Sequence, residues 1–150
     1  MALPPQKFRE IVFQLLYSQD FSEVLDEDMT PFMMQQLTVS KRVVREALAL
    51  QTQIKEKFKE IDPLITEASV EYAFDRIPKV ERTILRLGIF ELLFSTTVPG
   101  KVAIAEAIRL ARKFATPSGG TFINAILDFI YKKYVKEGAS NEDLLSVSRG

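Results

Sequence analysis

The stretch Ile84-Leu85-Arg86-Leu87-Gly88-Ile89-Phe90-Glu91-Leu92-Leu93-Phe94 decides the fold, because it is apolar on almost every side when it is wound into a helix. A helix of this kind is buried at the centre of a protein. We expect it to begin near Pro78 and to end near Ser95. In the rest of the chain the apolar residues recur with helical spacing, and no run alternates with the period of a strand. The sequence therefore predicts an all-α protein of about seven helices.

Prolines and capping residues mark where the surrounding helices begin. Ser40 is a typical N-cap, and Thr30-Pro31 and Asp62-Pro63 each combine a cap with a proline at the first helical position. Residues 116–120, which contain two glycines, predict a loop before the last helix. The helices are expected to span approximately residues 5–20, 31–37, 40–61, 63–74, 78–95, 99–114 and 122–134.

The composition excludes most enzyme chemistry. The chain has 150 residues, of which 47% are hydrophobic, so we expect a protein with a sizeable core. It contains no Cys and no His, which removes disulfides, thiolate nucleophiles, the commonest metal ligands and every triad that depends on His. The carboxylates of Asp26-Glu27-Asp28 lie in a hydrophilic connector that nothing places in a cleft. We therefore expect a binding protein without catalytic residues, cofactor or metal.

The 20 basic and 20 acidic residues balance, but they are unevenly distributed. Residues 1–75 carry eight Lys or Arg and 13 Asp or Glu, whereas residues 76–150 carry 12 and seven. This asymmetry is typical of a protein with a surface for a polyanion, although solvated helix faces explain it equally well. No run reaches the roughly 18 apolar residues of a membrane span, and the first residues are not typical of a signal peptide. We therefore expect a cytoplasmic protein.

Three features of the second half are candidates for binding a polyanion. The backbone N–H groups of Ser118-Gly119-Gly120-Thr121 could bind one phosphate at a helix start, although a plain interhelical loop is the alternative. Lys101 is predicted in the first turn of a helix, where a cation opposes the helix dipole by roughly 0.3–1 kcal/mol. A lysine at this unfavourable position can be explained by a polyanion that binds it. It can equally be explained by a flexible side chain that extends its ammonium group into water. Phe122 follows the glycines, and its ring either joins the core or contacts a ligand.

The first predicted helix carries a second face besides its core stripe. The core stripe comprises Phe8, Ile11, Val12, Leu15 and Leu16. Gln6, Arg9, Phe13 and Tyr17 lie nearly opposite that stripe. Two aromatic rings away from the stripe indicate either a wide buried face or a surface for a partner, which could be another protein or a second copy in a homodimer.

Four blocks of sequence resemble the signatures of the bacterial NusB family. They are REIVFQLLY (9–17), RIPKVERTILRLGIFEL (76–92), VPGKVAIAEAI (98–108) and FINAILD (122–128). Each block alone is moderately specific, whereas four blocks in a consistent order are a strong signal. The likeness covers roughly residues 6–133.

The resemblance implies two fused helical bundles, about residues 5–61 and 62–136, within one domain of residues 1–136. The small and polar residues at 137–150 are expected to form a loose tail. The family implies a transcription antitermination factor that pairs with NusE, a small-subunit ribosomal protein. The pair binds the single-stranded boxA element of nascent RNA and helps RNA polymerase to ignore terminators, notably in ribosomal RNA operons. By position, the residues on the RNA side would be Lys7, Arg9, Lys101, Ser118, Thr121 and Phe122. Those toward NusE would be Tyr17, Glu81 and Arg86.

The chain departs from the family pattern where the family carries polar and charged groups. Family members usually begin with an arginine-rich segment, whereas this chain has only Lys7 and Arg9 there. The usual Tyr after the proline of the sixth helix is Gly100, and the usual Asn is Ala105. Because each missing cation removes a phosphate contact, we expect the chain alone to bind RNA weakly and NusE to strengthen the binding.

Two other interpretations stay open. Some ribosomal RNA cytosine methyltransferases carry a NusB-like domain before their catalytic domain, but such enzymes need a nucleophilic Cys and the sequence has no Cys. A protein scaffold without an RNA role is the second interpretation, which the zero net charge and the few N-terminal cations favour. A scaffold predicts no boxA-dependent binding even when NusE is present.

Overall fold

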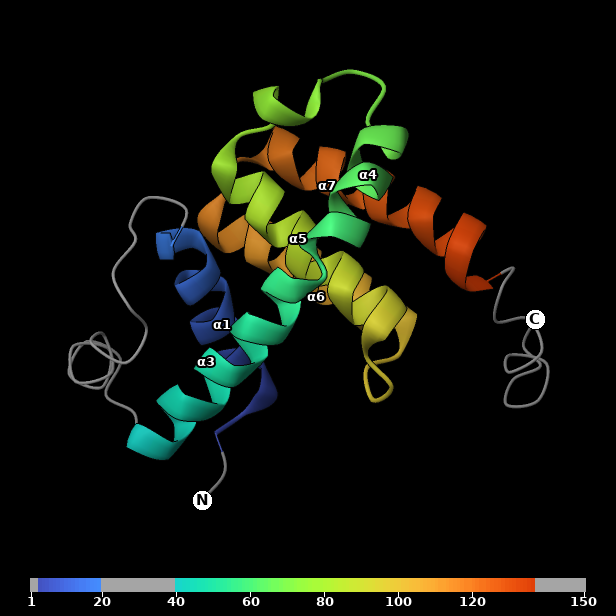
Figure 1. The fold of residues 1–150 in the computed structure, drawn as a ribbon. Helices are drawn as coiled ribbons and strands as arrows, with labels where there is room; N and C mark the ends of the chain where they lie inside the picture. The colour runs from blue at the N-terminus through green and yellow to red at the C-terminus, as the bar shows by residue number, and fades with distance from the viewer. Residues whose placement is uncertain (1–2, 20–39, 137–150) are drawn as a thin grey trace. The chain divides into compact units, whose positions relative to one another are not determined.

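The computed structural model describes residues 3–19 and 40–136 (Figure 1). They belong to two compact units that divide between Lys57 and Phe58. Every regular element of the described residues is a helix, which confirms the predicted all-α class. The α-helices are α1 (Pro5–Gln19), α3 (Lys41–Glu56), α4 (Phe58–Ala68), α5 (Lys79–Phe94), α6 (Gly100–Phe114) and α7 (Pro117–Ile130). A 3₁₀ turn at Phe74–Arg76 precedes α5, and a π-helix at Tyr131–Lys136 continues α7.

In the first unit, α1 and α3 pack against each other (Figure 1). The predicted core stripe of α1 is buried except at Phe8, which is half-buried. The buried Gln51 of α3 donates a 3.2 Å hydrogen bond from its Nε2 to the carbonyl oxygen of Leu15, which joins the two helices. Ser40 caps α3 as predicted, because its Oγ accepts a 3.2 Å hydrogen bond from the Val43 N–H.

In the second unit, α5 is the central helix and packs against α4, α6 and α7 (Figure 1). Its apolar residues are buried on nearly every side, as the sequence predicts, and Ile84, Leu85 and Ile89 are fully buried. Gly88 faces both α6 and α7. A Cβ there would lie 3.1 Å from Cδ1 of Leu127 on α7 and 3.5 Å from Cβ of Ala107 on α6. The missing side chain therefore allows α5 to approach both neighbours closely.

The helix start predicted at Asp62-Pro63 is wrong. Helix α4 spans Phe58–Ala68, so Pro63 lies inside it and the predicted bundle boundary at 61–62 falls within a helix. Proline has no N–H to donate, which costs the helix one backbone hydrogen bond. The flanking Ile61 and Ile65 are both fully buried, and this apolar burial offsets the lost hydrogen bond. The same helix ends at Ala68, earlier than predicted, and Phe74 instead opens the 3₁₀ turn.

The loop predicted at residues 116–120 is also wrong, because most of it forms the first turn of α7. Thr116 is the N-cap and Pro117 is the first helical residue. This cap followed by proline is a start signal that the two glycines obscured. Phe122 consequently lies in the second turn of α7 rather than the first.

Three sequence predictions lie outside the described residues: the helix at 31–37, the acidic run Asp26-Glu27-Asp28 and the tail at 137–150. Within the described residues, no helix is both long and apolar enough to cross a membrane. The same residues contain no group of three His, Cys, Asp or Glu side chains that could hold a metal ion.

Candidate functional site

The first two turns of α7 present two exposed hydroxyl groups, those of Ser118 and Thr121. The Oγ1 of Thr116 accepts a 3.1 Å hydrogen bond from the Gly119 N–H and lies 3.2 Å from the Ser118 Oγ. Thr121 donates a 3.4 Å hydrogen bond to the carbonyl oxygen of Pro117. These local hydrogen bonds fix the turn, and both side chains still face solvent.

Phe122 follows on the same helix and is half-buried, so it is neither fully core nor fully exposed. Its ring meets that of Tyr72 edge to face, with 5.5 Å between centroids and 81° between planes. Tyr72 is 48% exposed. Ser69 holds this loop residue, because its Oγ donates a 2.7 Å hydrogen bond to the Tyr72 carbonyl and accepts one of 3.4 Å from the Tyr72 N–H. Tyr72 could not be predicted as the neighbour of Phe122, because 50 positions separate the two residues in the chain.

Glu81 lies in the first turn of α5, yet it is only 8% exposed. No described residue donates a hydrogen bond to its carboxylate. The carboxylate lies directly against Gly119 in the first turn of α7, since a Cβ at Gly119 would overlap with Oε2 and lie 3.1 Å from Cδ of Glu81. Glu81 is thus a largely buried residue whose carboxylate is not engaged by the described residues, and a charge-assisted hydrogen bond from another molecule could form there.

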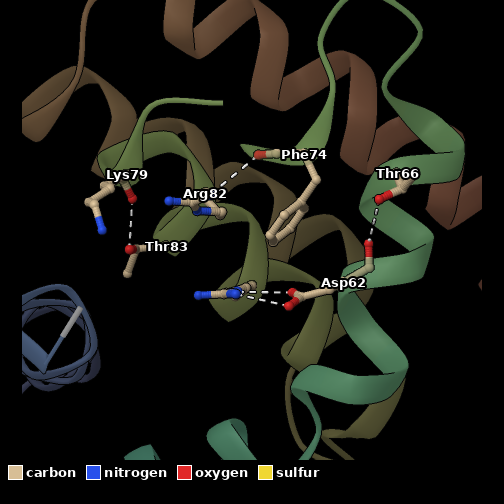
Figure 2. A network of polar contacts seen from close by, with 7 residues as sticks. Asp62, Thr66, Phe74, Lys79, Arg82 and Thr83 are labelled. Atoms are coloured by element: carbon tan, nitrogen blue, oxygen red, sulfur yellow. Dashed lines mark hydrogen bonds and ion pairs between the residues drawn. The ribbon is translucent and has the colours of Figure 1, made fainter. Parts of the chain in front are cut away.

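Arg86, five residues further along α5, is held inside the second unit. Its guanidinium donates two hydrogen bonds, of 2.9 and 2.8 Å, to the two carboxylate oxygens of Asp62 on α4. It also stacks 4.0 Å above the Phe58 ring and lies 5.4 Å from the Phe74 ring. Figure 2 shows Asp62 on α4 facing α5, and it shows separately the 3.4 Å hydrogen bond that Arg82 donates to the carbonyl oxygen of Phe74. The structure therefore gives Arg86 a role in joining α4 to α5.

Lys101 lies in the first turn of α6 and is exposed, as predicted. It makes no ion pair with any residue that the structure describes. Its neighbour Gly100 has no room for a side chain, because the ring of Tyr131 fills that space. Lys101 thus places an exposed charge, unpaired among the described residues, at the positive end of a helix dipole.

The remaining predicted residues belong to α1 in the first unit. Lys7 is exposed, and Arg9 is half-buried. Phe13 is 2% exposed, and Tyr17 is half-buried and stacks on it with 5.9 Å between ring centroids. The sequence left two interpretations of this aromatic face, a wide buried face or a surface for a partner. Phe13 agrees with the first, because it is buried, whereas the ring of Tyr17 is partly exposed and could contact a partner.

A charged cluster that the sequence did not indicate links the end of α4 to the π-helix. Glu67 accepts hydrogen bonds from Lys133 and from the hydroxyl of Tyr134. The hydrogen bond from Lys133 is the main reason why the pKa of Glu67 lies below its ordinary value. The same carboxylate raises the pKa of Lys133 and the pKa of Tyr134. The cluster is exposed and titratable, and it ties two elements that are 66 residues apart.

Comparison with known sequences gives one consistent result. A family model described as the NusB family matches residues 6–132. The transcription antitermination protein NusB of Chlamydia pneumoniae is 38% identical over 144 residues, covering 96% of this chain and 88% of that protein. The transcription antitermination protein NusB of Thermotoga maritima is 35% identical over 134 residues, covering 89% and 94%.

Solved structures show the same similarity. A crystal form of T. maritima NusB resembles the chain with a TM-score of 0.76 at 31% identity, covering 92% of this chain and 97% of that one. A crystal structure of the antitermination factors NusB and NusE in complex with dsRNA resembles it with a TM-score of 0.73 at 27% identity, covering 86% and 96%.

Proposed function

Because the chain belongs to the NusB family, we propose that it is a transcription antitermination factor that binds the single-stranded boxA element of nascent RNA together with NusE. In this role it acts in the cytoplasm within the antitermination complex of RNA polymerase, notably on ribosomal RNA operons. The observation that carries the proposal is the extent of the family match, which spans residues 6–132. We propose no catalytic role.

The start of α7 supports the RNA side of the proposal. Ser118 and Thr121 expose hydroxyl groups there, and Tyr72 exposes an aromatic ring against Phe122. Stacking of a base on such a ring is worth roughly 1–3 kcal/mol. The exposed ammonium group of Lys101 could bind a phosphate of the same strand, several nucleotides away from the base that stacks on the ring. The other residues proposed for RNA contact are Lys7 and Arg9.

Glu81 supports the protein side of the proposal. A Lys, an Arg or a backbone N–H of NusE would supply the hydrogen bond that the buried carboxylate lacks among the described residues. Tyr17 is proposed for the same partner because its ring is partly exposed. Arg86 is the third residue predicted toward NusE, and 13% of its side chain stays exposed beside its ion pair.

A homodimer through the aromatic face of α1 is the other predicted assembly. Because Phe13 is 2% exposed, Tyr17 is the aromatic side chain of that face which a second copy could contact. Light scattering at the concentrations used for RNA binding measures the mass directly, and a monomeric mass under those conditions excludes the homodimer as the RNA-binding form.

A titration of boxA RNA with the chain, with and without purified NusE, tests the proposed function. A scrambled strand of equal length and a duplex are the controls. We expect weak binding alone, at least tenfold tighter binding with NusE, and no such gain on the scrambled strand. Each phosphate contact contributes about −0.7 to the slope of log K against log salt concentration, so Lys101→Ala is expected to reduce the slope by about that amount. No boxA preference in the presence of NusE would instead support the scaffold interpretation.

Two substitutions test the protein face separately. Glu81→Ala and Tyr17→Ala are expected to weaken NusE binding, because one removes a buried acceptor and the other a partly exposed ring. Calorimetric titration with NusE measures the affinity, and thermal unfolding checks that both variants fold. Full NusE affinity in both variants would mean that the face is assigned wrongly.

A further inference from the structure

Gly119 is a buried glycine in the first turn of α7, and its missing side chain has a specific consequence for Glu81. A Cβ at Gly119 would overlap with Oε2 of Glu81 and lie 3.1 Å from Cδ and 3.2 Å from Cγ of the same side chain. All three of the nearest atoms belong to Glu81. The space that a side chain would take at position 119 is therefore the space that the carboxylate occupies.

The backbone does not require glycine at this position. Gly119 lies within a helix and its φ is outside the left-handed region, so alanine could adopt the same backbone. Glycine in a helix is less favourable than alanine by as much as about 1 kcal/mol. The feature of the structure that disfavours alanine here is thus the contact with Glu81.

The contact also leaves the carboxylate available to another molecule. The Gly119 N–H points to the Oγ1 of Thr116, at 3.1 Å, so it is already bonded within the turn. Glu81 accepts no hydrogen bond from the residues that the structure describes. The turn of α7 therefore sets the position of the carboxylate without occupying its lone pairs.

We propose that Gly119 is a positioning residue for the NusE face: its side-chain-free turn seats the Glu81 carboxylate where a donor of the partner reaches it. This inference rests on the proposed function, because it takes Glu81 as a contact for NusE. A methyl group at position 119 displaces the carboxylate by rotation of a flexible side chain, which costs the fold little. The same methyl group moves the acceptor away from the partner's donor, so the loss falls on NusE affinity.

The adjacent glycine provides a matched control. A Cβ at Gly120 meets only the Ala111 Cβ within 4 Å, at an ordinary 3.8 Å. Gly119→Ala and Gly120→Ala are the same chemical change, one position apart in the same helix. They differ in whether the new methyl group meets Glu81.

The experiment measures NusE affinity and thermal unfolding for four variants of the full chain: Gly119→Ala, Gly120→Ala, Glu81→Ala and the double variant Glu81→Ala/Gly119→Ala. We expect Gly119→Ala to weaken NusE binding about tenfold with no loss of thermal stability, and Gly120→Ala to keep the original affinity. In the Glu81→Ala background, the change at Gly119 should have no further effect on affinity. If Gly119 served only the stability of the helix, its substitution would change NusE affinity by the same factor whether or not Glu81 is present.

Three results would overturn the inference, and they are distinguishable. Equal NusE affinities of Gly119→Ala and Gly120→Ala, with Glu81→Ala weakened, would refute the positioning role and leave the proposed face intact. Unchanged affinity in Glu81→Ala would refute Glu81 as a contact for NusE and the inference with it. If Gly119→Ala unfolds while the double variant folds, the contact with Glu81 serves stability and the positioning role is rejected.

Discussion

The ion pair between Arg86 and Asp62 is expected to stabilise the second unit, and Asp62→Ala tests this directly. The substitution removes two hydrogen bonds of 2.9 and 2.8 Å from the guanidinium, which keeps its place over the Phe58 ring. The two side chains are 13% and 28% exposed, so the pair is largely but not fully removed from water. Breaking a fully buried pair costs about 3–5 kcal/mol, and an exposed pair is worth about 0.2–1 kcal/mol. We expect an intermediate loss of about 2–3 kcal/mol in the free energy of unfolding.

Thermal unfolding followed by circular dichroism measures this loss. In a unit of this size, 1 kcal/mol shifts the midpoint by about 4–8 °C, so a decrease of about 10–20 °C is expected. The ion pair of Arg42 with Glu46 supplies a control, because its side chains are 85% and 54% exposed. Glu46→Ala should lower the midpoint by about 1–4 °C, because an exposed i,i+4 ion pair contributes about 0.3–0.5 kcal/mol. Equal shifts in Asp62→Ala and Glu46→Ala would refute the structural role of the bridge.

The same variants separate the internal role of Arg86 from its predicted contact with NusE. If Arg86 acts only through the bridge, Asp62→Ala and Arg86→Met should change NusE affinity equally. A larger loss of affinity in Arg86→Met, measured under conditions where both variants remain folded, would demonstrate a contribution of the guanidinium beyond the ion pair.

Two other predictions follow from the aromatic pair and the charged cluster. Phe122→Leu is expected to weaken boxA binding in the presence of NusE about tenfold while the unfolding midpoint stays nearly constant; a lower midpoint with unchanged affinity would identify a core residue. Because the pKa of Glu67 is lowered on folding, its contribution to stability is present above the ordinary carboxyl pKa and is lost as the pH falls. The pKa values of Lys133 and Tyr134 are raised, so their contributions are lost as the pH rises through the folded values. Glu67→Gln should move the tyrosine titration, followed by ultraviolet absorbance, toward lower pH, and an unchanged titration would contradict the hydrogen bond.

Local signals in the sequence account for the parts of the fold that were predicted well. A helix of residues 84–94 is apolar on nearly every side and has no continuous polar face. It is therefore buried only if it lies at the centre of the packed helices. Ser40 caps α3 through the hydroxyl of its own side chain, which needs no information from elsewhere in the chain.

The predictions of helix boundaries that proved wrong lie where a local sequence signal competes with the packing of apolar side chains. Asp62-Pro63 has the pattern of a helix start, but Ile61 and Ile65 are fully buried and the helix continues across the proline. Asp62 serves instead as the partner of Arg86, which lies 24 positions away. The periodicity of apolar residues along the chain contains no information about an ion pair between residues that far apart.

The candidate residues on α5 show what the geometry adds to a resemblance. The resemblance assigns both Glu81 and Arg86 to the NusE side, yet five residues of an α-helix turn through about 500°, which places the two side chains roughly 140° apart around the axis. The structure agrees with this separation, since Glu81 lies against Gly119 of α7 whereas Arg86 binds Asp62 of α4. A partner seated over the Glu81 carboxylate approaches a different side of α5 from the side that holds the arginine. The carboxylate accepts no hydrogen bond from the described residues and the arginine is already paired, so the expected loss of NusE affinity is larger for Glu81 than for Arg86.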